Sequence, residues 1–240
     1  MTKGIALVTG ASSGIGAATA RALQADGWTV HATARRAAPL KALEVDGIST
    51  HVVDVNDRAT MNGLFGAHDF DLYVANAGRG GGMTGLADAN AEEIEAVVQT
   101  NVAALIHSVQ TAVSKMSARG RGHIITVGSV AGLYPTGAAL YGATKHAVRG
   151  FMRNLRLDPG AAGLRITDIQ PGRVATEFYD VAVTDEATRD RLKDTGIDEL
   201  SPEDVAEAIR WAAAQPPHVN VSALEITPRD QAYGGVKFTT

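Results

Sequence analysis

Hydrophobic residues along the chain follow two patterns that alternate. Short continuous apolar runs suit strands buried on both faces of a sheet, and the stretches between them have helical periodicity. The runs predict strands at residues 5–8, 28–33, 48–53, 71–75, 123–127, 164–169 and 223–227. The periodic stretches predict helices at 17–25, 58–65, 91–119, 141–157 and from Ser201 onward. We therefore expect an α/β fold with a doubly wound parallel sheet of about seven strands, flanked by helices.

Two segments near the C-terminal end complete this outline. A helix start is indicated by Ser201 as the cap, Pro202 in the first position and acidic residues in the first turn. The preceding residues, 184–196, are polar and irregular, and we expect them to form a lid or substrate loop.

A glycine-rich segment connects the first predicted strand to the first predicted helix. Its glycines are Gly10, Gly14 and Gly16. Glycine permits a sharp turn and close approach of a ligand, and the free amides at a helix start bind phosphate together with the helix dipole. The spacing is Gly-xxx-Gly-x-Gly, so the standard Gly-x-Gly-xx-Gly dinucleotide motif is not matched literally. The segment nevertheless predicts a nucleotide pyrophosphate site.

Two other interpretations fit the same segment. Gly10, Ser12 and Gly14 form the Gly-x-Ser-x-Gly pattern of a hydrolase nucleophile elbow, in which Ser12 would be the nucleophile. The glycines could also form an ordinary tight connection. A P-loop is excluded, because Ala17 and Ala18 follow the last glycine where Lys and Ser or Thr would stand.

Composition narrows the class of protein further. With 240 residues, 45% of them hydrophobic, the chain can bury a large core, and we expect one domain spanning 1–240. A net charge of −4 without a polybasic run argues against nucleic acid as a partner. The absence of cysteine excludes disulfides and thiolate metal sites. No apolar run approaches the ~20 residues of a membrane span, so we expect a cytoplasmic protein without a membrane partner.

The end of the second strand bears on the choice of nucleotide. An acidic residue there would accept hydrogen bonds from the adenosine ribose and repel a 2′-phosphate. In this chain Ala34 stands at that position, followed by Arg35 and Arg36. A guanidinium makes forked, charge-assisted contacts with phosphate, although an arginine pair is also common on ordinary surfaces. We therefore expect NADP(H) to be preferred over NAD(H).

Polar residues also follow the third and fourth strands. Asp54 ends the third strand, and Asn76, Ala77 and Gly78 end the fourth. In open parallel sheets, ligands bind outside the carboxyl ends of the strands. Asp54 could contact the adenine, and residues 76–78 allow close approach of the backbone. Each is also a plausible helix cap or turn residue.

A tyrosine and a lysine at helical spacing provide the strongest chemical signal. Tyr141 and Lys145 lie four residues apart, which places them on one face of the helix at 141–157. Because a nearby cation stabilises phenolate, Lys145 is expected to lower the pKa of Tyr141 from its usual value near 10. Ser129 ends the fifth strand and Asn101 lies within the helix at 91–119. A Tyr-xxx-Lys pair alone is common by chance, but after a strand-end serine it indicates a proton-transfer site.

Histidine is the remaining candidate for metal binding. The chain contains His31, His51, His68, His107, His123, His146 and His218. These lone residues show no ligand spacing, so we expect no metal site.

In order and spacing, these motifs resemble the classical short-chain dehydrogenase/reductase family over essentially the whole chain. The matching segments are 9–16, 76–78, 129, 141–145 and 171–172. The resemblance implies a Rossmann fold and a catalytic set of Asn101, Ser129, Tyr141 and Lys145. It also implies cofactor contacts from Gly10, Ser12, Ser13, Gly14, Ile15, Gly16, Arg35, Arg36, Asp54, Val55, Asn76, Ala77, Gly78, Tyr141, Lys145, Pro171, Gly172, Val174 and Thr176.

The resemblance assigns a role to each member of the catalytic set. Tyr141 would be the general acid in reduction and the general base in oxidation, and Ser129 would hold the substrate oxygen. Lys145 would lower the tyrosine pKa and bind the nicotinamide ribose. Asn101 would position a water molecule in the proton relay. Two hydroxyl donors at the carbonyl oxygen suit the negative charge that grows there during hydride transfer.

Later segments resemble the branch that contains 3-hydroxy acid and serine dehydrogenases, sulfoacetaldehyde reductases and clavulanic aldehyde reductase. They are 155–158, 176–178, 202–207, 217–220 and 224–228. After 176–178 the hydroxy-acid members carry Val-Arg-Phe, whereas this chain has Val-Ala-Val at 181–183. The change removes a partner for an anionic substrate, which Arg79 or Arg173 would have to replace. The resemblance also implies a homotetramer formed through helices 91–119 and 141–157.

The sequence thus predicts an NADP(H)-dependent oxidoreductase that acts on a small polar substrate. The reaction would interconvert an alcohol and a carbonyl on a hydroxy acid, hydroxy sulfonate or aldehyde. Two alternatives remain open, an elbow-type serine hydrolase that uses Ser12 and an NADPH-binding regulatory module. The combination of Ser129, Tyr141 and Lys145 favours the enzyme, because a sensor need not retain a proton-transfer set.

Overall fold

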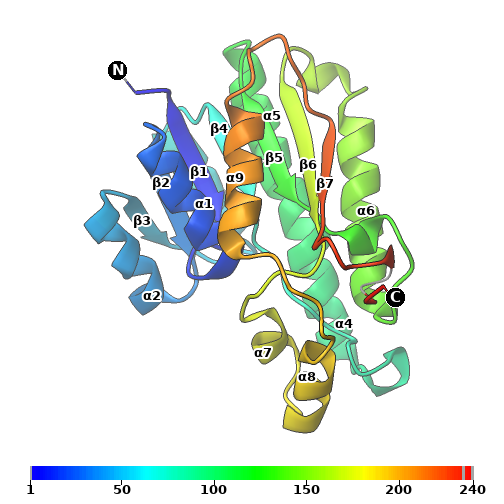
Figure 1. The fold of residues 1–240 in the computed structure, drawn as a ribbon. Helices are drawn as coiled ribbons and strands as arrows, with labels where there is room; N and C mark the ends of the chain where they lie inside the picture. Colours follow the sequence, from blue (N-terminus) through cyan, green and yellow to red (C-terminus); the bar gives the residue numbers. More distant parts are fainter. Residues whose placement is uncertain (1, 234–235, 239–240) are drawn as a thin grey trace.

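Seven strands form one parallel sheet in the computed structural model, which describes residues 2–233 and 236–238 (Figure 1). The strands are β1 (Ile5–Thr9), β2 (Thr29–Ala34), β3 (Ser49–Val52), β4 (Leu72–Ala75), β5 (His123–Val127), β6 (Arg165–Pro171) and β7 (Ala223–Ile226). Their order is β3-β2-β1-β4-β5-β6-β7, and all neighbouring pairs are parallel. The predicted sheet is confirmed.

Helices cover both faces of the sheet (Figure 1). On one face α1 (Gly14–Ala25) packs against α9 (Pro202–Ala213), and on the other lie α3 (Arg58–Ala67), α5 (Leu105–Ala118) and α6 (Ala139–Leu155). The shorter helices are α2 (Ala37–Lys41), α4 (Ala91–Val98), α7 (Phe178–Ala182) and α8 (Glu186–Lys193). Within the described ranges, no helix combines the length and apolar character needed to cross a membrane.

Strand β1 shows why continuous apolar runs predicted the sheet correctly. Ala6 and Val8 belong to the core under α1 and α9, whereas Leu7 belongs to the core under α3, α5 and α6. All three side chains are fully buried. Because successive strand residues point to opposite faces, a strand between two helical layers needs apolar residues at every position.

The direction of the chain across the sheet reverses at β1. From β1 the chain moves outward to β2 and β3, then returns to β4 on the other side of β1 and continues to β7. In open parallel sheets such a reversal leaves a crevice at the carboxyl ends of the strands, where ligands bind. The glycine loop follows β1 and residues 76–78 follow β4, so the crevice is where the sequence placed its cofactor site.

Two predicted segments differ from the structure. The helix expected at 91–119 is interrupted between α4 and α5 by a π-helical segment, Gln99–Ala104, which contains Asn101. Such wider turns occur frequently at functional sites. Residues 184–196 were expected to be irregular but include α8, whose cap Asp185 accepts a hydrogen bond from the backbone of Thr188. Helix α8 buries none of its residues, so it lacks the apolar stripe that reveals a helix in the sequence.

Helix α9 begins as the sequence predicts. Ser201 and Asp204 form a capping box, in which the Ser201 hydroxyl accepts the Asp204 backbone N–H at 3.2 Å and the Asp204 carboxylate accepts the Ser201 N–H at 2.7 Å. Pro202 occupies the first turn, where its missing donor costs nothing.

Candidate active site

A cavity of about 700 Å³ opens at the carboxyl ends of the strands. The loops after β1 to β6 line it, together with α6 and α7. All the predicted cofactor residues lie on its wall, and so do the catalytic candidates Ser129, Tyr141 and Lys145. Asn101 is the exception among the predicted site residues, because it is buried behind the wall with 2% of its surface exposed. Motifs far apart in the sequence therefore converge on one cavity.

The glycine loop is packed so tightly that side chains are excluded. A Cβ atom on Gly16 would lie 2.3 Å from the Gly10 carbonyl oxygen, and Gly10 itself has a φ of +67°. The Asn76 side chain holds the loop by donating hydrogen bonds to the carbonyl oxygens of Thr9, at 2.9 Å, and Gly10, at 3.3 Å. The first residues of α1 follow directly and line the cavity, and unpaired backbone amides at a helix start can bind an anion.

Arg36 connects the glycine loop to the far side of the cavity. Its guanidinium donates to the hydroxyls of Ser12, at 3.2 Å, and Ser13, at 2.5 Å, and it pairs with the Glu177 carboxylate at 2.9 Å. The side chains of the Arg36–Glu177 pair are 48% and 55% exposed, and such an exposed pair contributes little to stability. Arg36 can therefore leave Glu177 for a phosphate at low cost. Arg35 lines the same cavity.

The surroundings of Ser12 contradict the hydrolase interpretation. A nucleophilic serine needs a neighbouring base to accept its proton. The Ser12 hydroxyl instead accepts a hydrogen bond from Arg36, and a guanidinium has no acceptor. The nucleophile-elbow alternative is therefore rejected.

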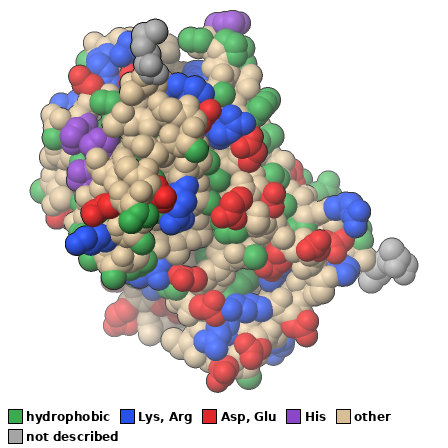
Figure 2. Space-filling model, turned by 60° about the vertical axis from the view of Figure 1, so that its left-hand side comes forward, with side chains coloured by type: hydrophobic (Ala, Val, Ile, Leu, Met, Phe, Trp, Pro, Cys, Tyr) green, Lys and Arg blue, Asp and Glu red, His purple; other side chains and the backbone are tan. Residues whose placement is uncertain are grey.

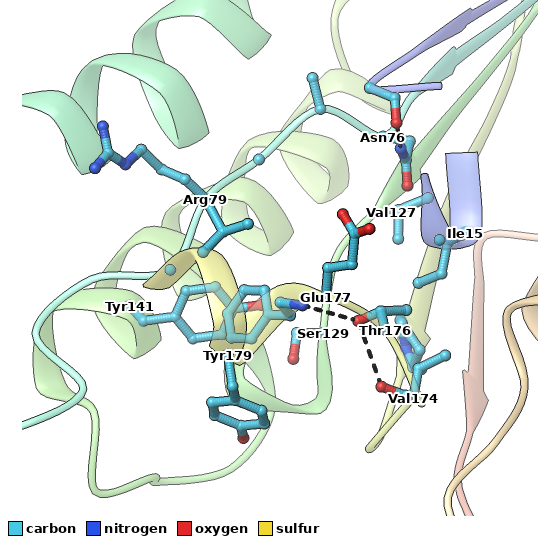
Figure 3. Close-up of a pocket in the computed structure, with 18 of the residues that line it drawn as sticks. Ile15, Asn76, Arg79, Val127, Ser129, Tyr141, Val174, Thr176, Glu177 and Tyr179 are labelled. Atoms are coloured by element: carbon cyan, nitrogen blue, oxygen red, sulfur yellow. Dashed lines mark hydrogen bonds between the residues drawn. The ribbon is translucent and has the colours of Figure 1, made fainter. Parts of the chain in front are cut away.

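Ser129 and Tyr141 lie close together inside the cavity (Figure 3). Ser129 follows β5, and its hydroxyl accepts a hydrogen bond from the Ala131 backbone at 3.1 Å. Tyr141 projects from the first turn of α6, and its ring lies 5.3 Å from the ring of Phe178 on α7. Burial raises the pKa of Tyr141 to about 12, and the hydrogen bond with Ser129 opposes this rise.

Lys145 lies one turn further along α6, below the tyrosine ring. Its ammonium nitrogen is 5.7 Å from the centroid of the Tyr141 ring and donates to the Val127 carbonyl oxygen at 2.9 Å. Burial lowers the pKa of Lys145 to about 8. The predicted lowering of the Tyr141 pKa by Lys145 is wrong, because desolvation of the phenol dominates and the ammonium bonds a carbonyl instead of the hydroxyl.

Asp168 is a charged member of the site that the sequence did not reveal. It lies within β6, is 3% exposed, and accepts hydrogen bonds from Thr126 and Gln170, each at 2.8 Å. Burial raises its pKa, while its negative charge favours the charged form of Lys145. The signal that points to such a buried partner is an acidic residue directly between the apolar or small residues of a predicted inner strand, here Thr167 and Ile169.

Asn101 acts on the backbone near the cavity instead of lining it. Its side-chain oxygen accepts the Arg79 N–H at 2.8 Å, and its amide donates to the Arg79 carbonyl at 2.9 Å and to Thr144 at 3.1 Å. These contacts occupy the side-chain amide. In this arrangement Asn101 fixes the loop after β4 and the turn of α6 that precedes Lys145.

The two arginines considered as anion partners are both poorly placed for that role. Arg173 pairs with Glu199 at 2.8 Å and donates to Tyr179 at 3.1 Å, so its charge is already neutralised. The side chain of Arg79 extends away from Tyr141 and Ser129 (Figure 3). Arg191, an exposed residue of α8, lines the cavity and was missed because α8 itself was not predicted.

Three of the histidines described above as lone residues are close together in the fold. His31, His51 and His68 lie together. Each offers one ring nitrogen, and these nitrogens are within 4.8 Å of one another. None of the three lines the cavity. Their sequence spacing carries no motif, because His31 and His51 are brought close by the pairing of β2 with β3 and His68 comes from the end of α3.

Comparison with known proteins agrees with this geometry. Residues 4–187 match a family model described as short chain dehydrogenase. The NADP-dependent 3-hydroxy acid dehydrogenase YdfG of Salmonella typhi is 37% identical, over 97% of this chain and 98% of its own length. Serine 3-dehydrogenase of Rhizobium radiobacter is 36% identical, over 97% and 96%.

Solved structures show the same relationship. The closed form of serine dehydrogenase complexed with NADP⁺ superposes with a TM-score of 0.90 at 36% identity, covering 98% of this chain and 99% of that one. Serine dehydrogenase from Escherichia coli superposes with a TM-score of 0.82 at 35% identity, covering 95% and 100%. On its motifs, its sheet and these matches, the chain belongs to the short-chain dehydrogenase family.

Proposed function

We propose that this protein is an NADP(H)-dependent oxidoreductase that interconverts an alcohol and a carbonyl on a small polar substrate, within one catalytic domain spanning 1–240. The observation that carries the proposal is that Ser129, Tyr141 and Lys145 share one cavity with the glycine loop. Placing a phenol and an ammonium there costs folding free energy. A protein that only senses a nucleotide does not need these groups, so their presence favours an enzyme. The relatives described above are dehydrogenases of hydroxy acids and of serine.

The cavity fits NADP(H) better than NAD(H). The glycine loop and the first amides of α1 suit the pyrophosphate, and Ala34, at the end of β2, presents no carboxylate to a 2′-phosphate. The Arg36 guanidinium lies at Ser12 and Ser13, beside the glycine loop. A 2′-phosphate bound there could accept two parallel hydrogen bonds from it. When bound, the nicotinamide supplies or accepts the hydride.

Tyr141 is the proton donor in the direction of carbonyl reduction. The raised pKa keeps the phenol protonated at neutral pH, which is the form that donates a proton. The Ser129 hydroxyl lies beside it, and together they stabilise the negative charge that develops on the substrate oxygen. The ammonium of Lys145, held by the Val127 carbonyl, lies 5.7 Å from the Tyr141 ring centroid. Its positive charge favours the phenolate once the proton has left, although desolvation outweighs this effect and keeps the pKa raised.

Asn101 completes the set as a positioning residue. Through Arg79 it orders the loop after β4, and through Thr144 it reaches the residue before Lys145. The resemblance assigns a relay water to Asn101. In this structure the side-chain amide of Asn101 is bonded to Arg79 and Thr144, so such a water would be held by other groups near it.

The substrate is a hydroxy acid, a hydroxy sulfonate or the corresponding aldehyde or ketone. The names of the relatives indicate hydroxy acids and serine. Of the three arginines near the substrate end, Arg79 extends away and Arg173 is paired with Glu199, which leaves Arg191 as the partner for an acidic group. Arg191 lies at the rim on an exposed helix, so we expect weaker binding of anions than a buried arginine would give.

We also propose a homotetramer assembled through the helices around α5 and α6, in the cytoplasm, where NADP(H) is available. Several apolar side chains on these helices are only partly buried in the single chain, which supports burial between subunits. They are Ile106, Val113 and Phe151, with Val98 of α4 42% exposed. Light scattering of the purified protein would give the number of chains, and fractionation of cells would give the location.

A substrate screen tests the proposed activity. Purified protein is mixed with panels of hydroxy acids and hydroxy sulfonates plus NADP⁺ or NAD⁺, and with aldehydes and ketones plus NADPH or NADH, while absorbance of the reduced cofactor is followed. We expect turnover of at least one small polar substrate, with kcat/KM at least about tenfold higher for the phosphorylated cofactor. Tight NADPH binding without turnover of any compound would instead support the regulatory module.

A further inference from the structure

Three histidines from separate elements meet away from the catalytic cavity. His31 lies on β2, His51 on the neighbouring strand β3, and His68 directly after α3. Each offers a ligand atom within 4.8 Å of those of the other two. Figure 2 shows histidine side chains gathered on the side of the molecule formed by the edge of the sheet. The cluster is part of the surface, so it is accessible to a solute.

The rings are arranged so that their nitrogens converge. His31 Nδ1 and His51 Nε2 are 2.9 Å apart, and the two rings are nearly parallel, with an interplanar angle of 7°. The His68 ring centroid is 4.1 Å from that of His31 and 6.1 Å from that of His51. A tetrahedral zinc ion with Zn–N bonds of 2.0–2.1 Å needs nitrogens about 3.3 Å apart. The 2.9 Å between His31 and His51 lies below this value and the 4.8 Å limit of the cluster lies above it, so the rings would have to turn to bind the ion.

A hydrogen bond explains only part of the cluster. One proton shared between His31 and His51 satisfies that pair. Among the described residues, no hydrogen bond to the His68 ring accompanies it, although that ring packs directly against His31. A cation bound by three nitrogen lone pairs would account for the position of all three rings.

The surroundings make the cluster rigid on one side and open on the other. His31 is 7% exposed and packs edge-on against Phe70, with ring centroids 5.4 Å apart. His51 and His68 are only half-buried, so this side of the cluster is in contact with solvent. The nearby Asp69 is paired with Arg119 at 3.1 Å, so the donors that converge here are imidazoles.

We propose that His31, His51 and His68 form a binding site for Zn²⁺, with a water molecule as the fourth ligand. Three neutral imidazoles bind zinc and its neighbours in the first transition row more strongly than they bind Mg²⁺ or Ca²⁺, which prefer oxygen ligands. Burial also lowers the pKa of His31 to about 4, in keeping with a neutral ring at neutral pH. Bound zinc would tie the edge strand β3 to β2 and to the end of α3.

The site is independent of the proposed reaction. None of its three ligands lines the cofactor cavity, and none belongs to the elements that carry Ser129, Tyr141 or Lys145. Zinc is therefore expected to stabilise the fold while leaving NADPH affinity within about twofold. This separation allows the metal site to be tested even if the substrate is never found.

The test uses tag-free protein, because a histidine tag would itself bind zinc. The full chain is stripped with EDTA, dialysed and titrated with ZnCl₂ in a calorimeter. We expect one zinc ion per chain, and a rise in Tm of roughly 5–10 °C at a zinc concentration 100 times the Kd. The variants His51→Asn and His68→Asn are expected to weaken zinc binding by about 100-fold or more, since each removes a ligand. His218→Asn, which changes an exposed histidine outside the cluster, should bind zinc like the wild type.

Two further measurements keep the proposal falsifiable. Circular dichroism and NADPH binding show whether each variant is folded. The wild type alone can be loaded with Co²⁺, whose visible absorption reports tetrahedral nitrogen coordination. The proposal is overturned if the wild type binds no stoichiometric zinc, if its Co²⁺ spectrum is that of an octahedral aquo ion, or if folded His51→Asn and His68→Asn variants bind zinc as tightly as the wild type.

Discussion

At the scale of single residues, Arg36 and Ala34 have the greatest influence on which cofactor fits. Ala34 stands where a carboxylate would favour an unphosphorylated ribose. The Arg36 guanidinium donates hydrogen bonds to the hydroxyls of Ser12 and Ser13. The exposed pair with Glu177 is the only ion pair of Arg36 among the described residues, and it is weak enough to break when a phosphate arrives.

Replacing Arg36 with alanine is expected to lower the affinity for NADPH much more than the affinity for NADH. The variant should lose about 10- to 100-fold in NADPH affinity, the effect of one charge-assisted contact, while NADH affinity changes little. Fluorescence titration of both reduced cofactors measures the difference, and Arg35→Ala shows how the two arginines share it. Arg58→Ala, on α3, is a matched control. Equal losses for NADPH and NADH would contradict the assignment of the 2′-phosphate.

At the scale of elements, the loop from β1 to α1 has its shape because two glycines leave no room for a Cβ atom. Gly16 faces the Gly10 carbonyl, and the Asn76 amide fills the remaining space. Helix α3 contains a glycine of a different kind. Gly63 lies on the exposed face of α3, and a Cβ added there would meet no atom within 4 Å.

These two positions give opposite predictions for the same substitution. Gly16→Ala should move the loop and reduce NADPH affinity by at least about tenfold, together with a loss of stability of about 1–3 kcal/mol from overpacking. Gly63→Ala should stabilise the protein by about 0.5–1 kcal/mol, because alanine is the better helix former. Urea unfolding and NADPH titration measure both effects. If Gly16→Ala were as well tolerated as Gly63→Ala, the tight packing described for the loop would be wrong.

The elements also show what the sequence could and could not predict. Tyr141 and Lys145 were found because helical spacing puts residues four apart on one face, whatever the rest of the fold does. The histidine cluster was missed because it depends on the pairing of β2 with β3 and on where α3 ends against them, which the sequence pattern does not contain. Helix α8 was missed because it buries nothing, and the direction of the Tyr141 pKa was wrong because burial, unlike spacing, is a property of the folded cavity.

At the scale of the whole molecule, buried histidines link stability to pH. His123 is 2% exposed and bonded to Thr167 at 2.8 Å, and burial lowers its pKa well below the usual value. Burial lowers the pKa values of His31 and His51 in the same direction. The unfolded chain therefore binds protons below about pH 6.5 that the folded chain does not, so stability falls as the pH drops below that value.

This linkage is measurable by urea unfolding at several pH values with EDTA present. Between about pH 6.5 and pH 5 the free energy of unfolding should fall by up to about 1.4 kcal/mol per pH unit for each such histidine, and above about pH 7 these groups should contribute no slope. The raised pKa of the buried Asp168 has the opposite effect on stability at lower pH, because there the folded chain binds a proton more readily than the unfolded chain. His218→Asn should leave the slope unchanged, since His218 is exposed. Stability that rose on acidification through this range would show that these histidines are not held neutral.

The central claim is that the buried Tyr141 hydroxyl transfers the proton to the substrate beside a bound nicotinamide. Its most direct test is to compare Tyr141→Phe with the wild type, measuring kcat on the best substrate of the screen and NADPH affinity in the same preparation. Tyr134→Phe, at a half-buried tyrosine whose hydroxyl donates to Glu225, serves as a control for loss of a hydroxyl outside the cavity. The account predicts a loss of about 100- to 10,000-fold in kcat for Tyr141→Phe, with NADPH affinity nearly unchanged. Turnover within a few fold of the wild type would contradict it.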